Sequence, residues 1–362
     1  MTDPTPNLAA PVPRRRKLLR VGIQVLGFAA GVASMAWCIS KAFKSDPHDP
    51  VNKFERLLHA PRHLLVAMFA LSFATMVING LLFWVGLLPV RRLRATDVVA
   101  TNGISSFLAY LPLKAGAIVR VLIHNRRDGV PLLTIGAWFA SMGVVIVAAF
   151  GPPLLAVLVL GPINRTWLLA VGAMEIAGGV ATVVGARLFR GQRGIERLTS
   201  IADALHLPAI KRFLRSGVWS KLHPGFEMIA SPWTVAASMV LRAMDVCVHS
   251  GRFLVAAAIL GVELPLSQAM PISLTFFLIG VVSPAGMAGL REGAATGLAG
   301  ILLAKAGADE DSYADFAKVA LLVTATEAIV FLASAAVGIA WLRPDRLLKL
   351  RQNATSQPIP PL

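Results

Sequence analysis

The sequence predicts an all-α, polytopic integral membrane protein with about eight transmembrane helices and a re-entrant or broken helical segment. Three observations support this fold class. Hydrophobic residues make up 56% of the 362 positions and charged residues only 15%, and the mean hydropathy is +0.68. Apolar runs of roughly 20 residues, enough for a helix to cross a hydrocarbon core of about 30 Å, recur along the chain. Basic residues border these runs, as they do on the cytoplasmic side of membrane proteins.

The N-terminal residues 1–19 are predicted to form a disordered, basic tail. Residues 1–13 are rich in Pro, Thr and Asn, a composition typical of disorder. The basic cluster Arg14–Lys17 precedes the apolar run 21–40 and resembles the start of a signal peptide. Because the run is long and lacks a convincing cleavage site, we predict a retained first span with a cytoplasmic N-terminus.

The remaining apolar runs place the other spans, with the basic loops on the cytoplasmic side. The acidic residues Asp309–Asp311 then lie outside, whereas the loop Lys41–Arg62, with five basic residues, fits this orientation poorly. An even number of spans puts both termini in the cytoplasm. We predict a membrane domain over 20–343 with a cytoplasmic amphipathic connection at 190–231, followed by a cytoplasmic tail at 344–362. The spans are predicted at 21–40, 63–88, 131–150, 166–189, 232–260, 266–283, 286–304 and 317–342.

The segment 101–120 does not have the composition of an ordinary span. It contains Pro112, Lys114 and Gly116 and is only moderately apolar. In the predicted orientation it begins and ends on the cytoplasmic side. Non-helical backbone at membrane depth is tolerated only where protein or water satisfies it. We therefore predict a re-entrant or broken helix here.

A second interrupted segment, 283–300, is rich in Gly and Ala and carries the adjacent pair Arg291 and Glu292. Both interrupted segments place a proline, then glycine, then arginine, which suggests two related halves. Interrupted segments in matching positions point to a transporter's binding site. The alternative for this pair is an interfacial anchor that holds a tilted helix by snorkelling.

The span 232–260 carries four polar residues, Arg242, Asp245, His249 and Arg252. Their i, i+3, i+7, i+10 spacing puts them on one face of one helix. A charge at mid-membrane costs roughly 2.5–3.5 kcal/mol on insertion scales, so such residues normally face protein or a wet cavity. Two interpretations are open: a polar cavity within the membrane, or a structural Arg242–Asp245 pair.

Two further acids, Glu175 and Glu327, lie near the middle of predicted spans without a local basic partner. A lone intramembrane carboxylate can be protonated, belong to a proton relay, or pair with an arginine on another helix. Pairing with Arg242 or Arg252 and a coupling role are both open.

The two interrupted segments also carry a family resemblance. The stretch from Ser283 to Gly293, SPAGMAGLREG, and the stretch from Leu111 to Arg120, LPLKAGAIVR, resemble the two signatures of the lysylphosphatidylglycerol synthase transmembrane family, also called flippase-like. The span pattern is similar over about 20–343. Lys114 and Ala117 stand where the family has arginine and glutamate, and Ala285 replaces a glycine.

The resemblance implies a multi-pass protein of the bacterial inner membrane that moves an amphipathic lipid between leaflets. It includes the membrane part only, because the aminoacyl-transfer domain of the fused members is absent from this sequence. Arginine suits a phosphate headgroup, since its planar fork donates paired hydrogen bonds. Three sets of residues follow from this. The headgroup candidates are Arg120, Arg242, Arg291 and Lys114. The charge-balancing or coupling candidates are Asp245, Glu292, His249, Arg252, Glu175 and Glu327. The broken-helix backbone is expected at Pro112, Gly116, Pro284, Gly286 and Gly289.

Other function classes lack their motifs. No HExxH, Walker A loop, GxSxG elbow or Cys-His metal spacing is present, so we expect no enzyme activity, cofactor or metal. The net charge of +16 is better explained by loops that meet an anionic cytoplasmic leaflet than by nucleic acid. The expected function is therefore a translocator of an anionic lipid or lipid-linked intermediate. The alternative is a non-catalytic accessory or scaffold subunit that assists a partner enzyme of lipid or envelope biosynthesis; a membrane-embedded transferase ranks third.

Overall fold

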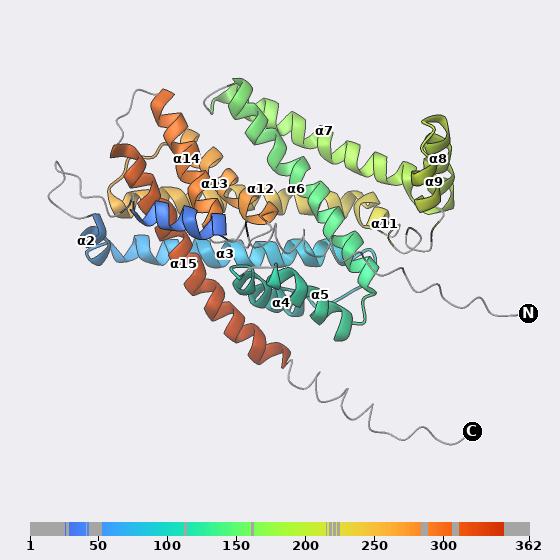
Figure 1. The fold of residues 1–362 in the computed structure, drawn as a ribbon, viewed down its shortest axis with the longest axis horizontal. Coiled ribbons are helices and arrows are strands. Elements are labelled where there is room, and N and C mark those ends of the chain that lie inside the picture. The colour runs from blue at the N-terminus through green and yellow to red at the C-terminus, as the bar shows by residue number, and fades with distance from the viewer. Residues whose placement is uncertain are drawn as a thin grey trace, which may run out of the picture.

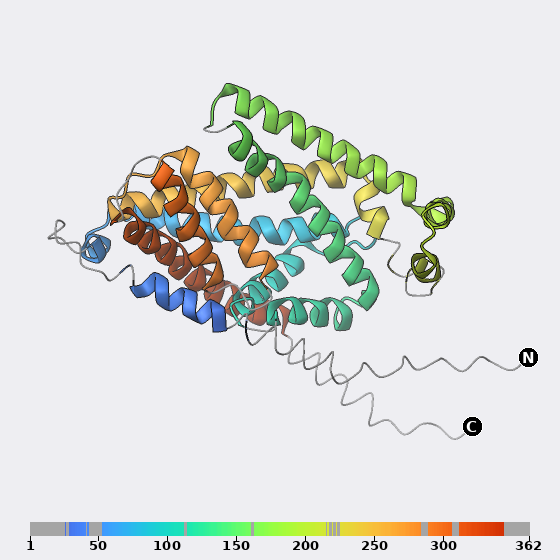
Figure 2. The ribbon, with the colours of Figure 1, turned by 45° about the horizontal axis from the view of Figure 1, so that its top comes forward.

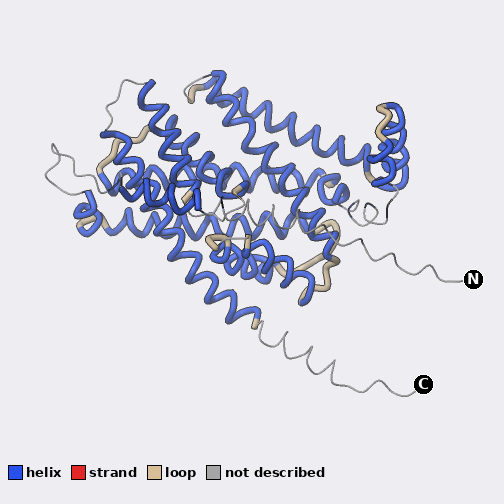
Figure 3. Tube along the Cα trace, viewed as in Figure 1, coloured by secondary structure: helices blue, strands red, loops and turns tan. Residues whose placement is uncertain are grey.

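In the computed structural model, every regular element of the described residues is a helix (Figure 3). The structure describes residues 29–40, 53–111, 114–160, 163–214, 225–283, 289–305 and 311–343, together with Leu26, Ala42, Ser216, Trp219 and Leu222. The predicted disordered tail at 1–19 and the tail at 344–362 lie outside these residues. The all-α prediction is confirmed.

Five helices are long and apolar enough to cross a membrane, which agrees with a polytopic membrane protein. Four of them pack into the bundle, whereas α7 lies along one side and is the least buried (Figures 1 and 2). The five long helices are α3 (Arg62–Leu87), α6 (Leu132–Leu160), α7 (Arg165–Phe189), α12 (Pro232–Leu260) and α15 (Asp311–Leu342).

Within the described residues, the other apolar helices are shorter than a full span, so the predicted count of eight is not confirmed. They include the apolar helix Ala29–Ser40, and two pairs joined by turns. The first pair is α4 (Ala95–Leu108) and α5 (Ala115–Arg126). The second pair is α13 (Leu266–Val282) and α14 (Leu290–Lys305). Helices of 12 to 17 residues rise only about 18–26 Å, less than the hydrocarbon core of about 30 Å.

Helices α3 and α12 run antiparallel through the centre of the bundle (Figure 1). Their register follows from two contacts, Asn79 with Asp245 and Leu71 with Gly251. At one end of α12 the buried side chain of Phe253 packs edge-on against Phe276 of α13. This apolar packing lies next to Arg252, at one end of the polar face of α12.

Small residues let α4 approach α15 closely, again antiparallel. A Cβ atom on Gly103 would lie 2.9 Å from the backbone oxygen of Ser334, and one on Gly338 would lie 2.6 Å from that of Ala100. Because real Cβ contacts are not this short, side chains larger than hydrogen would force the helices apart. The two glycines therefore set the separation of α4 and α15.

The connection at 190–231 contains three short helices, α8 (Gly191–Ala204), α9 (Pro208–Leu214) and α11 (Gly225–Ala230). Another short helix, α2 (Lys53–Leu58), precedes α3. Figure 1 shows α8 and α9 at the end of α7, outside the bundle. The connection predicted at 190–231 is thus helical at α8 and α9, and its position on the cytoplasmic leaflet stays a prediction. Several of their apolar side chains are exposed, including Ile201, Leu205 and Phe213, as expected of helices that meet a membrane surface.

Candidate functional site

The four polar residues of α12 all point into the bundle and are buried. Arg242, Asp245, His249 and Arg252 are each between 0 and 3% exposed, so the predicted shared face is confirmed. From Arg242 to Arg252 this face rises about 15 Å along the helix axis, half the thickness of a hydrocarbon core. Other helices supply the partners of these residues.

At one end of the face, Arg242 and Asp245 form an ion pair of 2.8 Å on the same helix. Asn79 of α3 joins this pair, because its amide oxygen accepts from Arg242 at 3.0 Å and its amide nitrogen donates to Asp245 at 3.4 Å. The Arg242 guanidinium also lies over the rings of Phe150 and Phe277. The pair therefore links α12 to α3 through one amide.

At the other end, Glu327 of α15 lies between two arginines. Its Oε2 atom pairs with Arg252 of α12 at 2.5 Å, and its Oε1 atom pairs with Arg291 of α14 at 2.7 Å. Tyr110, in the turn after α4, donates to Glu327 at 2.9 Å and accepts from Arg291 at 2.9 Å. One carboxylate thus holds together three helices and the α4–α5 turn. Of the two interpretations left open for Glu327, pairing with Arg252 is confirmed.

Glu292 completes this cluster at the start of α14. It accepts from the Nε of Arg291 at 3.0 Å and from the Thr324 hydroxyl of α15 at 2.5 Å. It also accepts from the backbone N–H of Gly289 at 2.5 Å. A carboxylate that binds a free N–H in the first turn of a helix is favoured by the positive end of the helix dipole. The adjacent Arg291 and Glu292 are at most 1% exposed, so they do not snorkel to an interface.

His249 lies between the two ends of the network. Its Nε2 is 3.6 Å from Asp245 and its Nδ1 is 3.5 Å from Arg252. Three arginines and three carboxylates then form one buried chain with balanced charge, from Arg242 through Glu327 to Glu292. Such balance is required, because an unpaired charge in this environment is very costly.

The two helical hairpins, α4–α5 and α13–α14, meet at this chain of buried charges. Besides the bond between Arg291 and Tyr110, the Lys114 ammonium in the α4–α5 turn donates to the backbone oxygen of Val281, at the end of α13, at 3.2 Å. Residues 181 and 167 positions apart in the sequence are thus in contact through these turns. Sequence reasoning predicted the two interruptions but not that they touch. Pro112, Pro284 and Gly286 lie outside the described residues.

The described glycines of these turns serve close packing. Gly289 has a φ of +92°, and a Cβ there would collide with the backbone of Gly31. Gly293 meets Ser34 of the same N-terminal helix, and Gly116 lies directly against the backbone of Ser105 on α4. The expectation of broken-helix backbone holds for Gly289, which precedes α14, but is wrong for Gly116, which lies in the first turn of α5 and serves close packing instead.

Arg120 lies apart from the network. It is 6% exposed, donates to the Asn102 side chain, and its guanidinium carbon is 3.6 Å from the centroid of the Phe83 ring. Asn102 in turn donates to the Met76 backbone oxygen at 2.7 Å. No carboxylate among the described residues pairs with Arg120, so a cation–π contact and a neutral amide hold this charge.

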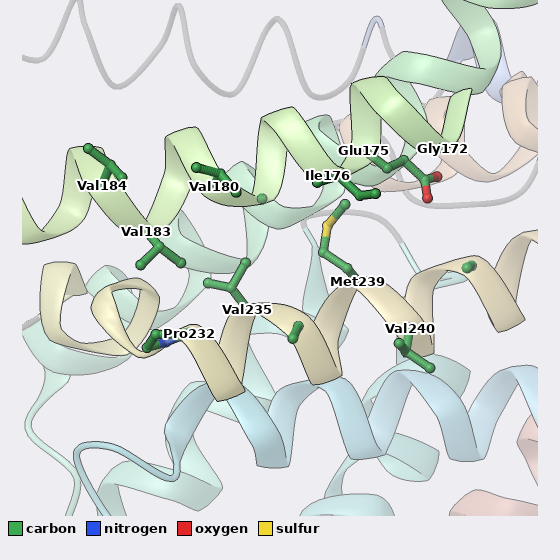
Figure 4. Close-up of a pocket in the computed structure, with 13 residues that line it drawn as sticks. Gly172, Glu175, Ile176, Val180, Val183, Val184, Pro232, Val235, Met239 and Val240 are labelled. Atoms are coloured by element: carbon green, nitrogen blue, oxygen red, sulfur yellow. The ribbon is translucent and has the colours of Figure 1, made fainter. Parts of the chain in front are cut away.

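Glu175 is also apart from the network. It lines an apolar groove of about 590 Å³ between α7 and α12, together with Gly172, Ile176 and Met239 (Figure 4). The structure pairs Glu175 with none of the described arginines, so of the two interpretations left open for this residue, pairing with Arg242 or Arg252 does not hold. The face of α12 that carries the arginines points into the bundle, whereas this groove lies on another face.

Four polar residues of the site were not singled out from the sequence. Asn79 stands alone in an apolar run, whereas Asn102 and Thr324 lie among other polar residues. Only its tertiary neighbours give each residue a role. Tyr110 had one usable signal, since it is one of two tyrosines in the chain and borders an interrupted segment. The four are Asn79, Asn102, Tyr110 and Thr324.

In the described part of the chain, no three His, Cys, Asp or Glu side chains are placed to hold a metal ion. Comparison with protein-family models, curated proteins and solved structures gave no match. The resemblance to the flippase-like family therefore stays a prediction, and function must be argued from the site itself.

Proposed function

We propose that the chain is a lipid translocator of the bacterial inner membrane that moves an amphipathic, anionic lipid or lipid-linked intermediate between leaflets. The observation that carries the proposal is the buried charge chain at the point where two helical hairpins meet. A translocator must shelter a charged headgroup while its acyl chains stay in hydrocarbon, which requires polar groups at membrane depth. Interrupted helices that meet at such groups are the arrangement found at transporter binding sites.

The balanced charges suggest how a lipid headgroup enters the buried charge network. Each arginine is already neutralised by a carboxylate, so an anion binds only where it replaces that carboxylate. Among the described residues, the Nε atoms of Arg242 and Arg252 have no hydrogen-bond partner. These two donors and the fork of Arg291 are the groups that a phosphate would engage as the hairpins separate.

The test is lipid movement in proteoliposomes that contain fluorescent phosphatidylglycerol, followed by quenching from outside. Wild type should move the lipid faster than protein-free liposomes. Tyr110→Phe, which removes only the hydroxyl that bridges Arg291 and Glu327, should change the rate about ten-fold or more, since a hydrogen bond to a charged group is worth about 1.5–3 kcal/mol. Thr182→Val removes a hydroxyl whose hydrogen bond, to the Gly178 backbone oxygen, stays within α7; it is the control outside the network and should leave the rate unchanged.

The scaffold alternative makes the opposite prediction. If wild type moves phosphatidylglycerol no faster than empty liposomes, and all three proteins are equally folded, the translocator proposal is wrong. The buried chain would then be a structural network that fixes the hairpins.

A further inference from the structure

A second groove, distinct from that of Glu175, lies between α3, α4 and α15. It has a volume of about 810 Å³ and an almost wholly apolar lining, with Phe69 and Phe73 on one side and Val337 on the other. Both phenylalanines are exposed. From Val330 to Trp341 the α15 wall rises about 16 Å, close to half of a 30 Å hydrocarbon core. The groove thus matches one acyl chain of one leaflet.

The groove ends at an interfacial tryptophan. Trp341 is 59% exposed, and its indole nitrogen donates to Asp97 at 2.8 Å, which ties the end of α15 to the start of α4. Tryptophan is enriched at the headgroup level of membranes. This end of the groove therefore lies where a headgroup belongs.

Two arginines flank this end. Arg94 is the N-cap of α4, and Arg343 directly follows α15. Because α4 and α15 are antiparallel, with Asp97 opposite Trp341, these two residues have matching positions across the contact. Both are exposed. Asp97 does not cancel their charge, since Arg127 pairs with it at 3.0 Å. Two positive charges are thus left over among the described groups at this end.

We propose that this groove binds one anionic phospholipid, with an acyl chain between α3 and α15 and its phosphate between Arg94 and Arg343. Charge complementarity selects the occupant: the lining holds an acyl chain, and the charges left over among the described residues at its end are positive. The site is separate from the translocation proposed above, because a lipid can be held here without crossing the membrane. Its inner end at Met76 and Val330 packs against Tyr110, so an occupant would support the hairpin turn.

The test is native mass spectrometry of delipidated full-length protein titrated with palmitoyl-oleoyl phosphatidylglycerol or the matched phosphatidylcholine. Wild type should retain phosphatidylglycerol preferentially. Arg94→Gln with Arg343→Gln should weaken that retention about 30-fold, since each basic residue near an anionic surface contributes about five-fold. Arg92→Gln, an exposed arginine of the same loop, is the matched control and should retain the lipid as wild type does.

A second variant tests the chain rather than the headgroup. Ala333→Phe fills the groove from α15 and should weaken binding of both lipids, with thermal stability measured alongside to show a folded protein. Equal retention of the two lipids by wild type would overturn the proposal. Unchanged phosphatidylglycerol binding by the double arginine variant or by Ala333→Phe would overturn it too. None of these results depends on whether the protein translocates lipid.

Discussion

Glu327 accepts charge-assisted hydrogen bonds from arginines on two other helices and a third bond from Tyr110. Burial makes each of these charges energetically costly when it is unpaired. An opposite charge and hydrogen bonds offset that cost. The same reasoning separates Glu327 from Glu175, which occupies a similar place in its own span but has no arginine beside it among the described residues. Position in the sequence does not distinguish these two acids; their neighbours do.

At the residue scale, Glu327→Gln should lower the free energy of unfolding by about 3–5 kcal/mol, because it leaves Arg252 and Arg291 buried without their shared counter-charge. Glu175→Gln is the same chemical change outside the network and should alter stability by less than about 0.5 kcal/mol. Thermal unfolding of both variants in one detergent measures the difference. Equal stability of the two would contradict the central place given to Glu327.

At the element scale, glycines fix how closely the helices pack. Gly338→Ala should destabilise the protein by about 1–3 kcal/mol, because the new Cβ meets the Ala100 backbone. Gly143→Ala is the control, since a Cβ there has no atom within 4 Å. It should be neutral or stabilising by about 0.5–1 kcal/mol, as expected when alanine replaces glycine inside a helix. Chemical unfolding of the two variants measures both effects, and a loss in Gly143→Ala as large as in Gly338→Ala would refute this packing role.

Much of the arrangement of the helices could be predicted from the sequence. The spacing of Arg242, Asp245, His249 and Arg252 predicted their common face, because helical period alone decides it. The composition of 101–120 predicted an interruption, and α4 ends and α5 begins within it, although Gly116 itself lies inside α5. The number of spans was not predictable in this way, because an apolar run near 20 residues does not reveal whether its helix crosses or turns back. The partners of Glu327 were hidden for another reason: ion pairs between helices depend on tertiary packing.

At the scale of the whole molecule, the two hairpins and the long helices form one bundle whose polar interior is charge-balanced. Contact between hairpin turns from the two halves of the chain is the arrangement on which the proposed translocation depends. If headgroups pass through this point, the turns must separate and re-form during each cycle. A protein locked with its turns together should then be inactive although correctly folded.

The most direct measurement is lipid movement by a variant whose turns are reversibly cross-linked. Lys114→Cys with Val281→Cys, in a background with Cys38→Ser and Cys247→Ser, would be joined by a short bifunctional methanethiosulfonate and assayed in proteoliposomes. We predict that cross-linking stops movement of fluorescent phosphatidylglycerol and that a reducing agent restores it. The rate of the same double-cysteine protein before cross-linking is the reference, so the loss of Lys114 itself does not enter the comparison. Undiminished movement with the turns joined would contradict the account.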